Sequence, residues 1–174
     1  DVTVRHIPGN LTDHYDPRNK TLGLSDATYG SASVAAIGVA AHECGHAVQH
    51  ATGYAPLKFR GALVPVANFG SAIAWPLILI GLVINSNSAL LFIDLGILLF
   101  SAAVLFQIVT LPVEFNASNR AVNALEKSGM LYPEEIRQTK AVLGAAALTY
   151  VASAASAVLQ LLRLIIIGGR RRND

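Results

Sequence analysis

The segment His42-Glu43-Cys44-Gly45-His46 carries two histidines and a glutamate in the pattern H-E-x-x-H. Residues four apart lie one above the other on a helix face, so His42 and His46 can reach one metal ion. Glu43 lies beside them, where its carboxylate can take a proton from water instead of binding the metal. The alternative is a helix that carries two structural histidines by chance. The constrained residue types favour a catalytic zinc site over that alternative.

The residues around this motif predict that it lies on a helix. An alanine-rich run over residues 31–41 precedes it, and residues 47–51, which follow it, also contain alanines. Gly53 is placed to end the helix, because glycine readily adopts the left-handed conformation that follows many last turns. We therefore expect a helix over residues 31–52.

A catalytic zinc ion usually takes three protein ligands, so a third residue is required. His50 continues the four-residue spacing, but roughly 12 Å of helix axis separates it from His42, too far to share an ion. Glu114 is the better candidate, since it follows Pro112 at the start of a predicted helix over residues 112–128. Small residues along that helix would allow a close approach to the H-E-x-x-H helix. The alternative for Glu114 is a charge at a membrane surface.

The first thirty residues predict a small β-sheet. Residues 2–7 and 21–25 have strand patterns, and a polar, turn-rich segment separates them. The edge of such a sheet could hold an extended peptide as an added strand. Asp13, His14 and Asp16 in the polar segment are a reserve set of metal ligands, for which turn chemistry is the simpler role.

A long apolar stretch predicts membrane-spanning helices. Asp94 is the only charged residue between Arg60 and Glu114. Helical crossings need about 20 residues each, which places two at residues 63–84 and 89–111, joined by a polar turn at residues 85–88. A third apolar run at residues 141–162 lies in a predicted long helix over residues 133–167. We favour a third crossing there over a buried soluble helix.

The two strong crossings bear directly on the zinc prediction. His46 and Glu114 can meet only if an even number of crossings separates them, and the sequence supplies two. The site is therefore expected on one side of the bilayer, close to its surface, with the hairpin over residues 63–111 as its anchor.

With these residues identified, the chain resembles the YugP-type membrane zinc metallopeptidases of bacteria over essentially its whole length. The resemblance implies a zinc-dependent, multi-pass protein of the bacterial plasma membrane with a zincin-like core. The fold expected is mainly α, with a small sheet, an inserted transmembrane hairpin and a third membrane helix. The matching stretches are 11–17 (LTDHYDP), 39–50 (VAAHECGHAVQH), 54–57 (YAPL), 63–69 (LVPVANF), 110–118 (TLPVEFNAS) and 145–151 (AAALTYV).

The pattern around Glu114 is also similar to that of HtpX-type endopeptidases and CAAX prenyl proteases, whose third ligand opens the sequence E-x-x-A-D. Here Ser118 stands where those proteases have aspartate, and Asn116 stands where YugP-type chains often have aspartate. Neither change removes a ligand, but both leave open which groups orient the zinc histidines. The family also carries an N-terminal membrane helix, after which this sequence is expected to begin.

Tyr150, in the family-like stretch AAALTYV, is a candidate donor to the oxyanion that forms during peptide hydrolysis. The alternative for its ring is packing at a helix interface. Cys44, the single cysteine, excludes an internal disulfide and fits a reducing compartment. It occupies a variable position of the motif, where we expect a small core residue and not a ligand.

Composition and charge limit the classes of function. The 174 residues are 53% hydrophobic and 14% charged, which is typical of one membrane-embedded catalytic domain over residues 1–174. The formal net charge of +2 is scattered and gives no nucleic-acid footprint. Six basic residues near predicted membrane ends favour a cytoplasmic catalytic face, while a compact triple arginine argues against it. The six are Lys58, Arg60, Arg120, Lys127, Arg137 and Lys140, and the three are Arg170, Arg171 and Arg172.

The leading hypothesis is a zinc-dependent endopeptidase that acts on polypeptides near the bilayer, either membrane-protein segments or unfolded chains. The competing hypothesis is a catalytically silent membrane scaffold that keeps zinc for folding. Glu43 discriminates between them, because a structural zinc site needs no general base. A regulatory membrane partner is left open by the sequence.

Overall fold

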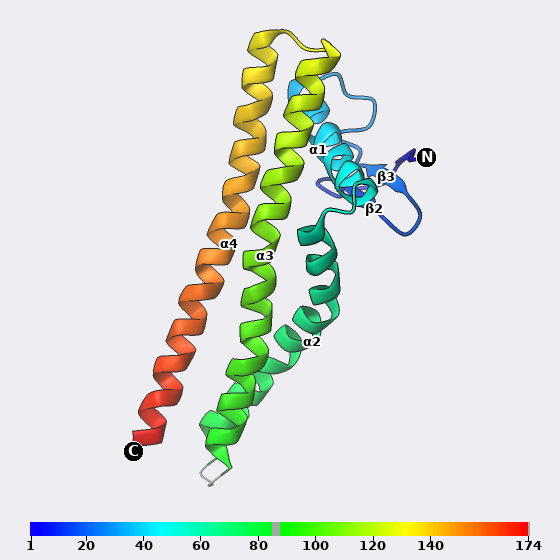
Figure 1. Cartoon of the computed structure of the whole chain (residues 1–174). Helices are drawn as coiled ribbons and strands as arrows, with labels where there is room; N and C mark the ends of the chain where they lie inside the picture. Colours follow the sequence, from blue (N-terminus) through cyan, green and yellow to red (C-terminus); the bar gives the residue numbers. More distant parts are fainter. Residues whose placement is uncertain (85–87, 174) are drawn as a thin grey trace. The chain divides into compact units, whose positions relative to one another are not determined.

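The computed structural model describes residues 1–84 and 88–173, which leaves most of the predicted turn at residues 85–88 outside the described part. These residues are mainly helical, with one small sheet near the N-terminus (Figure 1). They form two compact units, one of Asp1–Lys58 with Pro112–Thr149 and one of Phe59–Leu111 with the chain from Tyr150 onward. The elements are β1 (Thr3–His6), β2 (His14–Asp16), β3 (Thr21–Leu24), α1 (Val34–Ala51), α2 (Ala55–Val83), α3 (Ala89–Ser128) and α4 (Pro133–Asn173).

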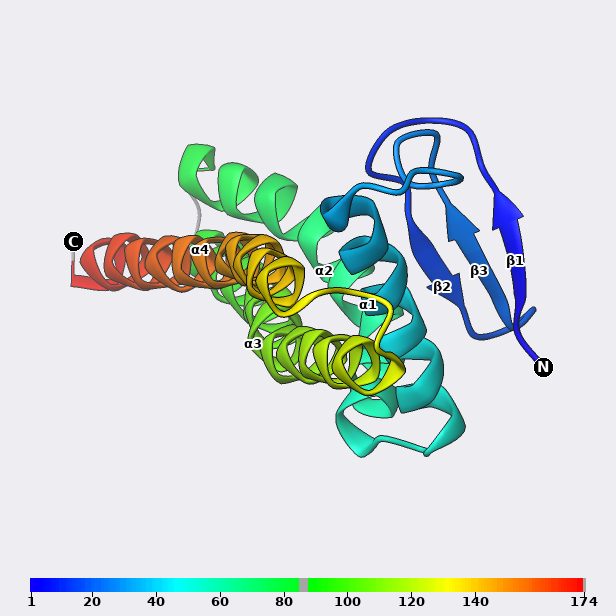
Figure 2. The ribbon, with the colours of Figure 1, turned by 90° about the horizontal axis from the view of Figure 1, so that it is seen from above.

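The sheet has the strand order β1-β3-β2, with β1 parallel and β2 antiparallel to the central β3. The two predicted strands are confirmed as β1 and β3, but β2 is additional. Its three residues are too few to show an alternating pattern in the sequence. Helix α1 contacts β2 and β3, and Figure 2 shows β2 nearest to it and β1 farthest away. One edge strand of the sheet therefore borders the H-E-x-x-H helix.

The polar residues on either side of β2 form turns. The carboxylate of Asp13 accepts hydrogen bonds from the backbone N–H and the hydroxyl of Ser25, both at 2.8 Å. Burial alone would raise the pKa of Asp13, but these hydrogen bonds hold it below its usual range. Asp16 closes the β2–β3 connection by accepting from the backbone N–H of Arg18 at 2.9 Å.

Helix α1 begins later than predicted and ends as predicted. The side chain of Ser33 accepts a hydrogen bond from the backbone N–H of Ala36 at 3.2 Å, which caps the helix three residues inside the expected start. At the other end Gly53 has a φ of 65°. This left-handed conformation ends the helix and explains the glycine at that position.

Helix α3 corrects the prediction that a separate helix begins at Pro112. It runs without a break from Ala89 to Ser128 and contains that proline. Proline in a helix interior costs one backbone hydrogen bond, and long apolar helices tolerate it because their other backbone bonds remain satisfied. The predicted second crossing and the helix of Glu114 are consequently one element. Helix α2 likewise starts earlier than residue 63, and α4 continues past residue 167.

Among the residues that the structure describes, three helices are long and apolar enough to cross a membrane: Ala55–Val83, Ala89–Ser128 and Pro133–Arg171. In the second unit α2 and α3 pack closely through glycines. A Cβ on Gly70 would lie 2.6 Å from the carbonyl oxygen of Leu99, and one on Gly96 would lie 2.9 Å from that of Ala74. Small residues at such crossings allow two backbones to approach closely, as in many membrane helix pairs.

A candidate metal centre between helices α1 and α3

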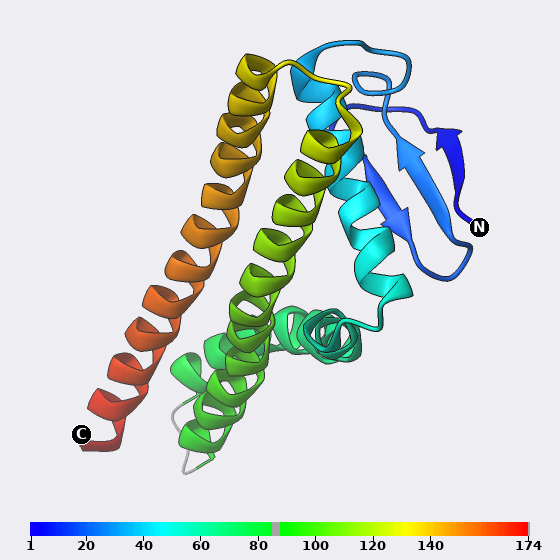
Figure 3. The ribbon, with the colours of Figure 1, turned by 45° about the horizontal axis from the view of Figure 1, so that its top comes forward.

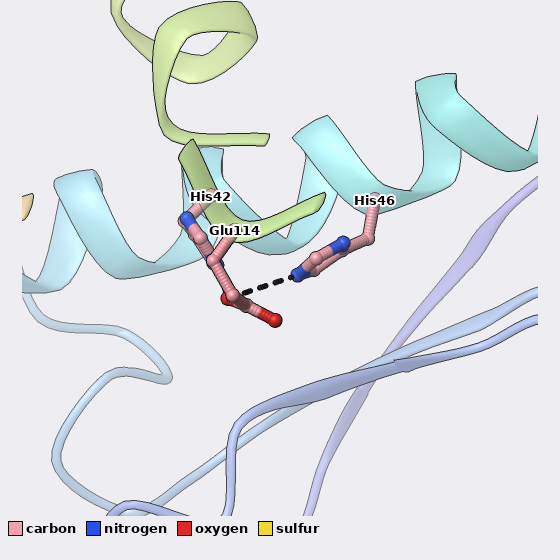
Figure 4. Close-up of side chains that lie close together, drawn as sticks. All are labelled: His42, His46 and Glu114. Carbon is pink, nitrogen blue, oxygen red and sulfur yellow. Dashed lines mark hydrogen bonds and ion pairs between the residues drawn. The ribbon is translucent and has the colours of Figure 1, made fainter. Parts of the chain in front are cut away.

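His42 and His46 lie on successive turns of α1, and Glu114 extends toward them from α3, as Figure 4 shows. One ligand atom from each of the three side chains lies within 4.8 Å of the others. The Nε2 atoms of His42 and His46 are 3.1 Å and 3.6 Å from the same Glu114 oxygen, Oε2. This is the cluster of metal-ligating side chains found in the described part of the chain.

A glycine of the motif makes this approach of α1 and α3 possible. A Cβ at Gly45 would collide with the backbone carbonyl of Ala117 on α3. Val113 and Ala117, on the facing side of α3, are fully buried. Any larger residue at position 45 would push the helices apart and draw Glu114 away from the two imidazoles.

The cluster is largely shielded from solvent. The side chains of His42 and His46 are 14% and 12% exposed, and that of Glu114 is 3% exposed. Burial alone would lower the pKa of His46, but hydrogen bonding to Glu114 and the negative charges of Glu114 and Glu43 raise it overall. Such a site attracts positive charge, whether a proton or a cation.

Glu43 is buried on α1 beside the two imidazoles. Burial raises the pKa of Glu43, against the charges of His46 and His42, which lower it. A backbone hydrogen bond from Tyr15 in β2 also acts on this carboxyl and lowers its pKa. A glutamate whose pKa is raised is a stronger base than an exposed one, which suits proton transfer at neutral pH.

The donor atoms fit a catalytic zinc ion. Two imidazole nitrogens and one carboxylate oxygen are a ligand set that such sites use. The Nδ1 atom of each ring has its own partner: Ser118 Oγ lies 3.0 Å from that of His42, and Gln49 Oε1 lies 2.9 Å from that of His46. The Nε2 atoms, which face the Glu114 carboxylate, are therefore the ones available to a metal.

Gln49 was not identified from the sequence. A polar residue three positions after His46 stays on the inner side of the helix, and that spacing was the available signal. Ser118 was identified there only as a departure from the aspartate of related proteases. Its contact with His42 shows where that position lies in the site.

Other residues considered from the sequence lie outside the cluster. Cys44 is exposed, so the prediction of a small core residue is wrong, because its side of α1 is not covered. The reserve residues Asp13 and Asp16 form turns, and His14 Nδ1 contacts the carbonyl oxygen of Thr12 at 2.8 Å. Tyr150 lies on α4 in the second unit, and its role as an oxyanion donor stays a prediction.

Comparison with known proteins agrees with the resemblance noted in the sequence. The sequence profile of a family described as "Putative neutral zinc metallopeptidase" matches residues 1–169. The protein named "Putative membrane protease YugP" from Bacillus subtilis (strain 168) is 47% identical over 175 residues, which cover 99% of this chain and 76% of that protein. None of the solved structures matches the chain. The chain thus belongs to this family.

Proposed function

We propose that the chain is a zinc-dependent endopeptidase of the bacterial plasma membrane that hydrolyses polypeptides at or near the bilayer surface. The observation that carries the proposal is the position of Glu114. Its carboxylate comes from a helix far along the chain, yet lies 3.1 Å from His42 Nε2 and 3.6 Å from His46 Nε2. These three side chains would hold the zinc ion of a zincin-like core.

In the proposed peptide hydrolysis, the zinc ion and the side chains of the protein have separate roles. A zinc ion held by these three residues would supply Lewis-acid chemistry, which polarises a peptide carbonyl and makes water more acidic. The Glu43 carboxylate accepts the proton of the attacking water and returns it to the nitrogen of the leaving amine. Its burial supports this role, since a carboxyl with a raised pKa holds the proton long enough to pass it on.

The sheet supports an extended polypeptide as substrate. Strand β2 pairs with β3 on one side only, and its other side faces α1 (Figure 3). The backbone of Tyr15 in β2 is within hydrogen-bonding reach of Glu43. A peptide that added to this edge as a strand would therefore pass beside the catalytic base.

The membrane location rests on the three apolar helices and on the membrane protease relative. We place the catalytic unit on the cytoplasmic side, following the excess of basic residues around it. Reporter cysteines at Lys58 and Lys127, in a Cys44→Ser background, should react with a membrane-impermeant reagent only after the cytoplasmic face is exposed. Reaction of either one in intact cells would contradict the orientation.

The deciding experiment compares the parent protein with Glu43→Gln in detergent. The parent should contain zinc and cleave an unfolded test protein, and a chelator should abolish the cleavage. The variant should retain zinc while its cleavage rate falls by about 10²–10⁴-fold, the usual contribution of a general base. Glu126→Gln, the same change at an exposed position of α3, is the matched control and should cleave like the parent.

Each outcome has a clear meaning. If Glu43→Gln cleaves as fast as the parent, the endopeptidase proposal fails. A parent protein that binds zinc but cleaves nothing favours the silent scaffold instead.

A further inference from the structure

A single buried amide connects the metal centre to the body of α3. Gln49 on α1 is 0% exposed. Its Oε1 lies 2.9 Å from His46 Nδ1, while its Nε2 lies 2.8 Å from the carbonyl oxygen of Val113 and 3.0 Å from Asn116 Oδ1. All three contacts lie within the first unit.

The hydrogen-bond partners of Gln49 determine which atom of its side-chain amide is the oxygen and which is the nitrogen. Oxygen and nitrogen of an amide look alike, so their assignment must come from the hydrogen-bond network. The backbone carbonyl of Val113 can only accept a hydrogen bond, which requires the NH₂ group of Gln49 to face it. The oxygen of Gln49 must then face His46.

A second contact reaches the same result independently. The guanidinium of Arg120 can only donate, and its Nε lies 2.8 Å from Asn116 Oδ1. The Asn116 atom between Arg120 and Gln49 is therefore the carbonyl oxygen, which again requires NH₂ on the Gln49 side. Arg120 is itself placed over the ring of Tyr54, 5.9 Å from its centre, which restrains the guanidinium.

The orientation of the Gln49 amide determines which nitrogen of the His46 imidazole carries the proton. Gln49 Oε1 carries no hydrogen, so His46 Nδ1 must be the donor in their 2.9 Å contact. A neutral imidazole has one N–H, which leaves its lone pair on Nε2, the atom directed at Glu114. We infer that Gln49, held by Asn116 and Arg120, fixes the tautomer and the ring orientation of His46 for metal binding. This inference rests on the proposed function for the identity of the metal.

His42 provides an internal contrast. Its Nδ1 contacts the hydroxyl of Ser118, which can donate or accept. That contact orients the ring without deciding its tautomer. The two histidines therefore differ: Gln49 fixes the tautomer of His46, whereas the hydroxyl of Ser118 accommodates either tautomer of His42.

The test uses the full chain in detergent with ¹⁵N-labelled histidine, together with zinc affinity from competition with a chelator. In metal-free parent protein, at a pH high enough to make the imidazole neutral, the nitrogen signals of His46 should show one tautomer, protonated at Nδ1. Gln49→Leu should give a mixture of tautomers and lower the zinc affinity about 10–100-fold, as loss of such outer partners does. Asn116→Asp keeps the acceptor for both Gln49 and Arg120 and should stay close to the parent in both measurements.

Thr139→Val controls for a change in the core, since Thr139 is fully buried in the same unit and its hydroxyl donates to the carbonyl oxygen of Glu135 within α4. It should leave both the His46 signals and the zinc affinity unchanged. If Gln49→Leu fails to fold, Asn116→Leu makes the same test with Gln49 in place, with a smaller loss of affinity expected because Val113 still holds the amide.

The inference is overturned if Gln49→Leu, or Asn116→Leu in its place, keeps a single Nδ1–H tautomer and the zinc affinity of the parent. Failure of the proposed function looks different. A parent protein that binds no zinc would end the metal proposal, while the tautomer measurement on that same protein would still decide the role of Gln49.

Discussion

The two units use the same packing device with different results. In the first unit Gly45 lets α1 approach the backbone of α3 at Ala117, and in the second Gly70 lets α2 approach it at Leu99. Around the first contact the buried residues include Glu43, Gln49 and Glu114, which are polar or charged. Around the second they are apolar, among them Ala67, Ala74, Ile78 and Ile93.

The difference shows what close helix packing contributes to function. Where apolar side chains meet, a shift of a few tenths of an ångström weakens many small dispersion contacts. Where buried polar groups meet, the same shift breaks hydrogen bonds and leaves their partners unsatisfied, which costs more for each group. The position of α1 against α3 therefore determines whether the buried polar groups keep their hydrogen bonds. The position of α2 against α3 determines only how well apolar side chains pack.

The largest effect is expected from Gly45→Ala. The added Cβ meets a backbone carbonyl that cannot move aside, so the free energy of unfolding should fall by about 3 kcal/mol. Zinc affinity should fall as well, because Glu114 recedes from the histidines. Chemical unfolding in detergent and chelator competition measure the two effects.

The control for this prediction is Gly144→Ala in the same unit, where no atom lies within 4 Å of the added Cβ. This change should raise the free energy of unfolding by about 0.5–1 kcal/mol, the ordinary gain of alanine over glycine in a helix. Equal gains at positions 45 and 144 would show that α1 and α3 are not packed as described.

A smaller effect is expected from Gly70→Ala in the second unit. Its Cβ would lie 2.6 Å from the carbonyl oxygen of Leu99, so stability in detergent should fall by about 1–2 kcal/mol. Zinc affinity should not change, in contrast to Gly45→Ala. Gly61→Ala, on the same helix with nothing within 4 Å, serves as the control. Loss of zinc affinity in Gly70→Ala would remove the distinction between the two units.

The smallest effect, about 1 kcal/mol, is expected from Asp13→Asn near the sheet. Hydrogen bonds from Ser25 hold the folded-state pKa of Asp13 below its usual value near 3.8. The stabilisation by the carboxylate is thus present above the unfolded-state pKa and is lost as the pH falls through the folded-state pKa. Thermal unfolding of both proteins across pH 3–7 should show a difference at neutral pH that shrinks in acid. A difference independent of pH would contradict this assignment.

Local regularities made part of the site predictable from the sequence. The four-residue spacing of His42 and His46 on a helix follows from helical geometry alone. Glu114 followed from the even number of crossings, the small residues near it and the demand for a third ligand. The three long apolar helices were predictable because about 20 apolar residues in a row are a sufficient signal.

Other features depended on how α3 is rotated against α1, which no local pattern encodes. Gln49 bonds to a carbonyl 64 residues away and Ser118 to a histidine 76 residues away, so their roles appear only once the helices are packed. The continuation of α3 through Pro112 also depends on the tertiary structure, since local rules favour proline at a helix start. The sequence by itself determined which residues can bind a metal and take up a proton. The tertiary structure decided which groups hold them in place, because a hydrogen bond depends on the distance and direction between elements that the chain brings together from afar.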